Sequence, residues 1–259
     1  MLPKYENESH LQHYHQLVLL RSPLYFDQLV GTNLQYVNSK DKSKVHVIKS
    51  NNSTKSAISN FVMRAGKHYV EFPNESGRGF FSANETGIMR PIKGWHRKRE
   101  KKTKTKSELV NHFNPTWLKK AFSIELLGGK NERWGESNVH ACMLTAGRGL
   151  CHWSNWEQHG RGHEGGLLQW DGQENFSSLG RLFGGIGSNG SLLPPSPRRD
   201  GPPTRGMLLD LDEGTLSVYK NGRRLGVMMS GLTGEYVWVV SLGRTSTASI
   251  RRAPIPVDE

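Results

Sequence analysis

Long hydrophobic runs are missing from this 259-residue sequence. Nothing in it approaches the roughly 18 consecutive apolar residues that a membrane-spanning helix needs, so no transmembrane segment is expected. The first ten residues, MLPKYENESH, are polar and acidic before any apolar stretch, which differs from a secretory signal. We therefore expect a soluble intracellular protein that is cytoplasmic, nuclear or both.

Cysteine is also scarce, with Cys142 and Cys151 as the only two. They flank a turn at residues 146–149 and could face each other across a hairpin. Thiols inside cells are normally kept reduced, so a disulfide is not expected. We interpret both cysteines as small packing residues.

Motifs for catalysis are absent as well. The sequence holds neither a Gly-x-Ser-x-Gly elbow nor a His-Glu-x-x-His helix, and we predict no enzyme activity. Residues 185–190, GIGSNG, match the spacing of a dinucleotide-binding turn, which requires a following helix to hold the pyrophosphate. Pro194, Pro195 and Pro197 prevent such a helix, so we expect a loop and no cofactor.

A zinc site is similarly disfavoured. His140 and Cys142 share one face of a strand, whereas Cys151 and His152 are neighbours and point to opposite faces. No more than three of these four side chains can converge, and structural zinc is almost always bound by four. We therefore predict no metal site.

Residues 206–226, GMLLDLDEGTLSVYKNGRRLG, carry the clearest structural pattern. Asn221-Gly222 is typical of a tight type I′ hairpin turn, and residues 212–215 supply an earlier turn with glycine. Around these turns apolar residues alternate: Met207, Leu209, Leu211, Leu216, Val218, Leu225 and Val227. This period predicts three antiparallel strands with one buried face, which must pack against a second sheet.

Further strands are expected along the chain. Residues 34–37 and 45–48 should form a hairpin, and residues 58–63 and 67–72 a second pair around Ala65-Gly66. Additional strands are predicted at residues 86–90, 139–145 and 149–153. Residues 9–20 show the pattern of a short helix that Pro23 closes.

Three blocks resemble the SPRY domain family. They are residues 66–72 (GKHYVEF), 206–226, and 236–243 (YVWVVSLG). The resemblance implies an antiparallel β-sandwich of concanavalin or jelly-roll type, here with a short N-terminal helix and two long insertions. It also implies a non-catalytic, monomeric module for protein–protein interaction, which binds a peptide or folded partner through loops at one end. Family members often serve as recognition subunits of ubiquitin-ligase or chromatin and RNA assemblies.

The domain organisation follows from these patterns. Residues 1–30 are assigned to an N-terminal extension, 31–252 to the sandwich and 253–259 to a tail. The sandwich would contain a basic insertion at 96–121 and a Gly/Pro-rich insertion at 157–205, where strand and helix periods both fade.

Exposed aromatic and arginine side chains dominate binding energy at many interfaces, which guides the choice of candidate binding residues. We select Arg90, Trp95, Trp156 and Tyr236, all assigned to loops, whereas Trp238 is expected in the core.

The basic run RKREKKTKTK forms a second candidate. It contains seven cations against Glu100, half of the formal net charge of +12. The cations are Arg97, Lys98, Arg99, Lys101, Lys102, Lys104 and Lys106. The run is consistent with three interpretations: a nuclear-import signal, a contact to nucleic-acid phosphates, or a solvated loop.

Overall fold

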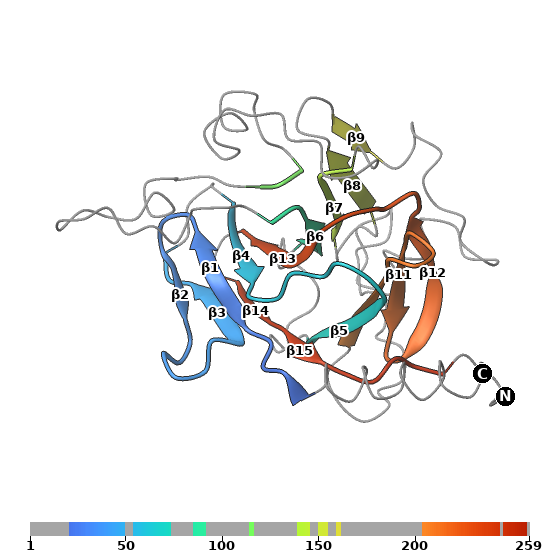
Figure 1. Cartoon of the computed structure of the whole chain (residues 1–259). Coiled ribbons are helices and arrows are strands. Elements are labelled where there is room, and N and C mark those ends of the chain that lie inside the picture. Colours follow the sequence, from blue (N-terminus) through green and yellow to red (C-terminus); the bar gives the residue numbers. More distant parts are fainter. Residues whose placement is uncertain are drawn as a thin grey trace, which may run out of the picture.

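The fold is an all-β sandwich made of antiparallel sheets (Figure 1). The computed structural model describes residues 21–49, 54–73, 85–91, 114–116, 139–145, 150–154, 159–161, 204–243 and 246–257. The helix expected at residues 9–20 lies outside these residues. Among the described residues, no helix has the length and apolar character to cross a membrane.

One layer is a seven-stranded sheet with the order β1-β4-β13-β6-β7-β8-β9. Its strands are β1 (Phe26–Val30), β4 (Lys55–Ser59), β6 (Glu85–Met89), β7 (Ala141–Thr145), β8 (Leu150–Ser154), β9 (His159–Arg161) and β13 (Val237–Leu242). β1 belongs to the part of the chain that the sequence assigned to the N-terminal extension, and it pairs with β4.

The facing layer is a five-stranded sheet with the order β12-β11-β10-β5-β15. Its strands are β5 (Lys67–Pro73), β10 (Thr204–Asp210), β11 (Thr215–Lys220), β12 (Arg223–Met229) and β15 (Arg251–Arg252). A small third sheet has the order β14-β3-β2, from β2 (Leu34–Tyr36), β3 (Lys44–Val47) and β14 (Thr247–Ser249).

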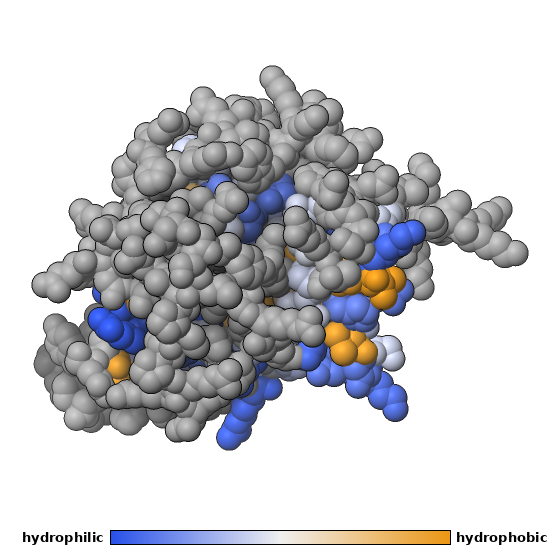
Figure 2. All heavy atoms as spheres, turned by 180° about the vertical axis from the view of Figure 1, so that it is seen from behind, coloured by the Kyte–Doolittle hydropathy of each residue, from blue (hydrophilic) through white to orange (hydrophobic). Residues whose placement is uncertain are grey.

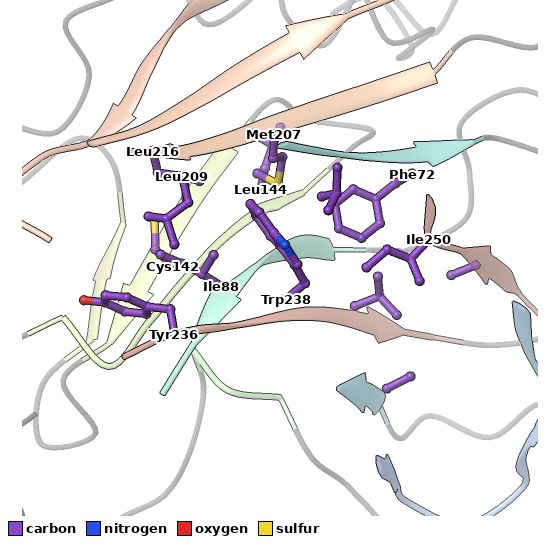
Figure 3. Close-up of a cluster of buried hydrophobic side chains, with 14 of the residues drawn as sticks. Phe72, Ile88, Cys142, Leu144, Met207, Leu209, Leu216, Tyr236, Trp238 and Ile250 are labelled. Atoms are coloured by element: carbon purple, nitrogen blue, oxygen red, sulfur yellow. The ribbon is translucent and has the colours of Figure 1, made fainter. Parts of the chain in front are cut away.

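The core fills the space between the two large sheets (Figure 3). Trp238, Ile88 and Leu144 point inward from the seven-stranded sheet, toward Met207 and Leu209 of β10. The Trp238 ring meets Phe72 of β5 edge-on, with ring centroids 6.3 Å apart. Trp238 is fully buried, as the sequence predicted.

The predicted meander is confirmed, with one correction in β12. Asn221 and Gly222 have φ values of 50° and 80°, as a type I′ turn requires. Leu225 and Val227 are only half-buried, while Met228 and Met229 are buried instead. The reason is that the β11–β12 ladder shifts register twice, and such bulges change which residues face the core.

The hairpin expected near residues 34–48 is confirmed by the pairing of β2 with β3. The second predicted pair, 58–63 with 67–72, is wrong. β4 pairs with β1 and β13, whereas β5 pairs with β10 and β15 in the other layer. The chain crosses between the layers here, so that apolar residues of β4 and β5 enter the core from opposite sheets.

The two predicted insertions are described only in part. Residues 114–116 pack at β6, where Asn114 donates a hydrogen bond to the Glu85 carboxylate. Residues 159–161, placed at the start of a structureless insertion, instead form β9 at the edge of the sheet. A three-residue strand is too short to show a recognisable alternation, which explains the error.

Candidate functional site

Three loops meet at one end of the sandwich, and we call them together the loop end: residues 62–66, 211–214 and 230–236. Met63 and Tyr236 exchange two backbone hydrogen bonds of 2.8 and 3.0 Å. Leu211 N–H donates to the Gly66 carbonyl, and Leu232 N–H donates to the Gly214 carbonyl. Each loop is thus tied to another by the backbone, and their exposed side chains share one surface.

Arg90 holds this end together from inside. It follows β6, and its side chain is fully buried. Its Nη1 donates hydrogen bonds to the carbonyl oxygens of Thr233 (2.6 Å) and Glu235 (3.0 Å). Its guanidinium also stacks on the Tyr236 ring, 4.0 Å from the centroid. Burial lowers the pKa of Arg90, while Tyr236 and Glu235 act in the opposite direction.

Tyr236 connects the same loop to the segment that precedes β7 of the seven-stranded sheet. Its ring is fully buried, and its hydroxyl donates a hydrogen bond of 3.0 Å to the Val139 carbonyl oxygen. The two residues therefore fix the path of residues 230–236 by cation–π stacking and by charge-assisted hydrogen bonds.

These positions correct the expectation that Arg90 and Tyr236 lie exposed. Both side chains face inward, so they can support a binding surface but cannot offer their own side chains to it. Trp95, Trp156 and the basic run Arg97–Lys106 lie outside the described residues. The structure thus brings together two of the four selected residues.

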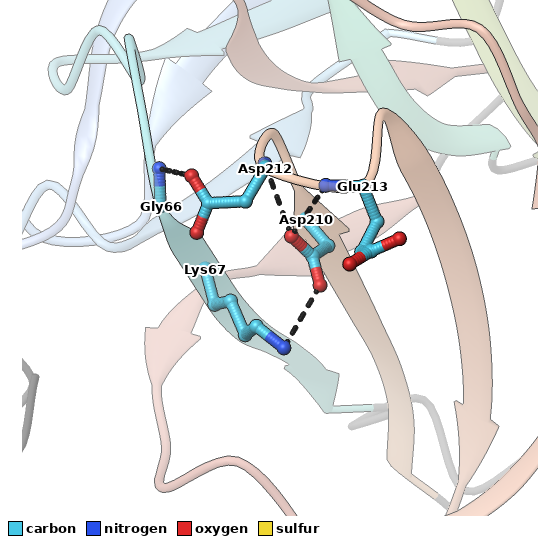
Figure 4. Close-up of polar contacts among 5 residues, drawn as sticks. All are labelled: Gly66, Lys67, Asp210, Asp212 and Glu213. Atoms are coloured by element: carbon cyan, nitrogen blue, oxygen red, sulfur yellow. Dashed lines mark hydrogen bonds and ion pairs between the residues drawn. The ribbon is translucent and has the colours of Figure 1, made fainter. Parts of the chain in front are cut away.

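A turn network stabilises the neighbouring loop (Figure 4). Asp210 Oδ1 accepts hydrogen bonds from the backbone N–H groups of Asp212 and Glu213, and its Oδ2 lies 3.0 Å from Lys67 Nζ. Asp212 in turn accepts a hydrogen bond from the Gly66 N–H. The two aspartates therefore shape the turn and join it to the loop before β5.

The outer surface of the loop end is polar and slightly acidic. Arg64 forms an exposed ion pair of 2.6 Å with Glu235. Asp212, Glu213 and Thr233 are exposed alongside it. One arginine against three carboxylates gives these loops a formal charge of −2, in a chain whose net charge is +12.

Sequence reasoning missed the roles of Asp210 and Arg205. An Asp followed two and three residues later by turn positions is typical of a side-chain-capped turn, so the pattern around Asp210 could have been found. Arg205 shares the inward face of β10 with Met207, and it donates a 2.7 Å hydrogen bond to Thr86 of the facing sheet. Arg205 lies two residues before Met207, so the alternation extended back by one step places it on the inward face, although an arginine is seldom expected to be buried.

In the described residues, no group of three or more His, Cys, Asp or Glu side chains converges, so their geometry does not support a metal site. Cys142 and Cys151 are both buried in the core, with their sulfur atoms 3.5 Å apart. Burial, together with the neighbouring Cys151, raises the pKa of the Cys142 thiol.

Comparison with known proteins gives matches in solved structures alone. No family model matches the sequence, and no curated protein matches it. The TRIM65 PSpry domain aligns over 93% of this chain and 95% of its own, with 13% identity and a TM-score of 0.46. The SPRY domain of human HERC1 aligns over 86% and 96%, with 12% identity and a TM-score of 0.42. Stonustoxin aligns over 90% of this chain and 27% of its own, with 15% identity and a TM-score of 0.38. Two of these three structures are SPRY domains, the family that residues 66–72, 206–226 and 236–243 resemble. The antiparallel β-sandwich of this chain follows from its own strand pairing.

Proposed function

We propose that this protein is a non-catalytic interaction module that binds a peptide or folded protein through the loop end. The observation that carries the proposal is the buried Arg90, which stacks on Tyr236 and holds two carbonyl groups of residues 230–236. A side chain of this kind fixes a loop whose own residues are mostly exposed.

The advantage of such a loop is energetic. Binding costs free energy for every flexible segment that must be ordered, and a surface held in place beforehand avoids that cost. The backbone bonds among the three loops and the Asp210 network have the same effect. The exposed groups that remain, such as Arg64, Glu213 and Thr233, supply hydrogen-bonding and charge contacts.

More specifically, we propose that the protein serves as a recognition subunit of a larger ubiquitin-ligase or chromatin and RNA assembly, in the cytoplasm or nucleus. It rests on the family resemblance of the three sequence blocks. The alternative is a nucleic-acid-associated protein that contacts phosphates through Arg97–Lys106, which the net charge of +12 favours.

The test is affinity capture from lysate with full-length protein, followed by mass spectrometry. One variant combines Arg64→Glu with Glu213→Lys, and both positions are exposed at the loop end. The matched control is Arg223→Glu, an exposed position at the Asn221-Gly222 turn, beyond the other end of β11. We expect the double variant to lose a protein partner that the control retains.

Equal capture by both variants would reject the loop end as the binding surface. In parallel, titration with RNA and duplex DNA at two salt concentrations tests the alternative. A strongly salt-dependent affinity that disappears when residues 97–106 are deleted would favour nucleic acid over protein.

A further inference from the structure

A second exposed surface lies on the hairpin of β2 and β3, which Figure 1 places on the opposite side of the molecule from the loop between β12 and β13. Three large apolar side chains of the described residues are exposed: Val37 at 48%, Ile48 at 49% and Val257 at 89%. Val257 belongs to the C-terminal tail, whereas Val37 and Ile48 lie on the same hairpin. Seen from behind, isolated apolar residues lie among hydrophilic ones on the described part of the surface (Figure 2).

Alternation explains why these two residues face outward. Leu34, Val45 and Val47 of the hairpin are buried in the core. Gln35 and Val37 on one strand, and His46 and Ile48 on the other, therefore belong to the opposite face. This face is an outer surface of the small sheet.

The register fixes the distance between the two apolar residues. Val37 lies opposite Lys44 and Ile48 opposite Asn33, with hydrogen bonds of 3.0 and 2.9 Å. The pair Gln35 and His46 lies between those rows. Val37 and Ile48 are thus separated by four residues along the strand direction, about 13 Å. An extended peptide presents its residues i and i+4 on one face at the same separation.

The charge of the hairpin is strongly positive. Residues 33–49 contain Lys40, Lys42, Lys44 and Lys49 against Asp41, a formal charge of +3. Lys42 does not belong to this face: its Nζ lies 5.6 Å from the Tyr25 centroid and 5.7 Å from the Tyr36 centroid, and Tyr36 lies on the buried side of the hairpin with Leu34. Asp41 is engaged locally, because its Oδ1 accepts a hydrogen bond from the Ser43 N–H.

We propose that this hairpin face binds an extended acidic peptide segment of a partner protein, with apolar residues at positions i and i+4 over Val37 and Ile48. Lys40, Lys44 and Lys49 attract the acidic residues, and the two aliphatic side chains fix the register of the peptide. The proposal is independent of the loop end. A nucleic acid suits this face less well, because Tyr36 lies on the buried side of the hairpin with Leu34 and is not offered for base stacking.

The probe is a phage-displayed library of random nine-residue peptides, selected on full-length protein. The test variant is Val37→Ser combined with Ile48→Ser. Two variants serve as controls: Val257→Ser, which removes an exposed apolar group elsewhere, and Arg223→Glu, which reverses an exposed charge elsewhere. Circular dichroism and thermal melting check that all variants remain folded.

We expect a class of selected peptides that is acidic, carries apolar residues four positions apart, and binds the controls normally. Synthetic copies should bind the double variant at least roughly tenfold more weakly by fluorescence anisotropy. The reason is that the exposed half of the Val37 and Ile48 side chains can no longer be buried by the peptide. Moving the second apolar residue to i+3 should weaken binding comparably. Lys40→Glu with Lys49→Glu should abolish it.

Several results would overturn the proposal. One is a selection in which every enriched peptide binds the double variant as well as it binds the original protein. Another is an affected class of peptides without acidic residues or without the four-residue spacing. The third is binding of phosphatidylserine/phosphatidylcholine vesicles or of a single-stranded oligonucleotide that the double variant loses, since this would assign the face to another class of ligand.

Discussion

Gly87, in the middle of β6, should not tolerate even an alanine. A Cβ atom at this position would lie 2.0 Å from the carbonyl oxygen of Cys142 and 2.7 Å from Cα of Met143. Ordinary contact between non-bonded heavy atoms is about 3.5–4.0 Å. Because both neighbours are backbone atoms of β7, a side-chain rotation cannot relieve the clash. The two strands must separate.

The cost follows from what that separation disrupts. β6 and β7 pair from Glu85 opposite Thr145 to Met89 opposite Ala141. Overpacking costs about 1–3 kcal/mol, and losing two ladder hydrogen bonds adds about 1 kcal/mol each, so we expect about 3–5 kcal/mol in total. Domains are stable by about 5–15 kcal/mol, so Gly87→Ala should be severely destabilised or unfolded.

Urea unfolding followed by circular dichroism measures this loss of stability. Gly222→Ala is the matched control, because nothing lies within 4 Å of its added methyl group and only its φ of 80° is unfavourable. It should cost about 1 kcal/mol. If Gly87→Ala lowers the free energy of unfolding no more than Gly222→Ala does, the close approach of β6 and β7 described above is incorrect.

Three further predictions concern polar groups. Tyr36→Phe removes a 2.8 Å hydrogen bond to the Phe26 carbonyl and should cost about 1 kcal/mol in urea unfolding. Burial raises the pKa of Tyr36 to about 12. The stabilisation that the Tyr36 hydroxyl contributes to the folded protein should therefore be complete below the ordinary pKa of tyrosine and be lost as the pH rises through about 12. When tyrosine ionisation is followed by absorbance, the variant should lack the tyrosine that titrates near pH 12. Asn221→Ala loses both the tolerance for positive φ and a 2.8 Å bond from the Thr204 N–H, and should cost about 1–2 kcal/mol; Asn221→Gly should be milder. Burial raises the pKa of Glu85, so its contribution to stability is present at acidic pH and falls as pH rises through the raised pKa. Glu85→Gln should flatten the dependence of the urea midpoint on pH, and an unchanged slope would contradict this assignment.

The sequence predicted those strands that have one buried face and a distinctive turn. Asn221-Gly222 and the alternation around Leu209 and Leu216 indicated the meander, and they allowed its burial against a second sheet to be inferred. The amino-acid sequence could not predict which strands share a sheet. The loop between β4 and β5 is short enough for a hairpin, yet the chain uses it to cross between layers, and no local pattern distinguishes the two cases.

The candidate site was predicted by residue type rather than by exposure. Arginine and aromatic residues are common at interfaces, but Arg90 and Tyr236 satisfy each other inside the protein. The cation–π stack joins β6 to a residue more than a hundred positions later in the sequence. That kind of pairing depends on sheet order, which the sequence alone left undetermined.

The order of residues along β6 links the two ends of the sandwich. Thr86, near its start, accepts a hydrogen bond from the buried Arg205 of the facing sheet. Ile88 lies in the core, and Arg90 follows the strand and holds the loop end. All three face inward, so the register that positions one of them positions the others. A strand displaced at Gly87 therefore shifts Arg90 as well, and a variant that survives folding should lose partner binding at the loop end although no exposed residue has changed.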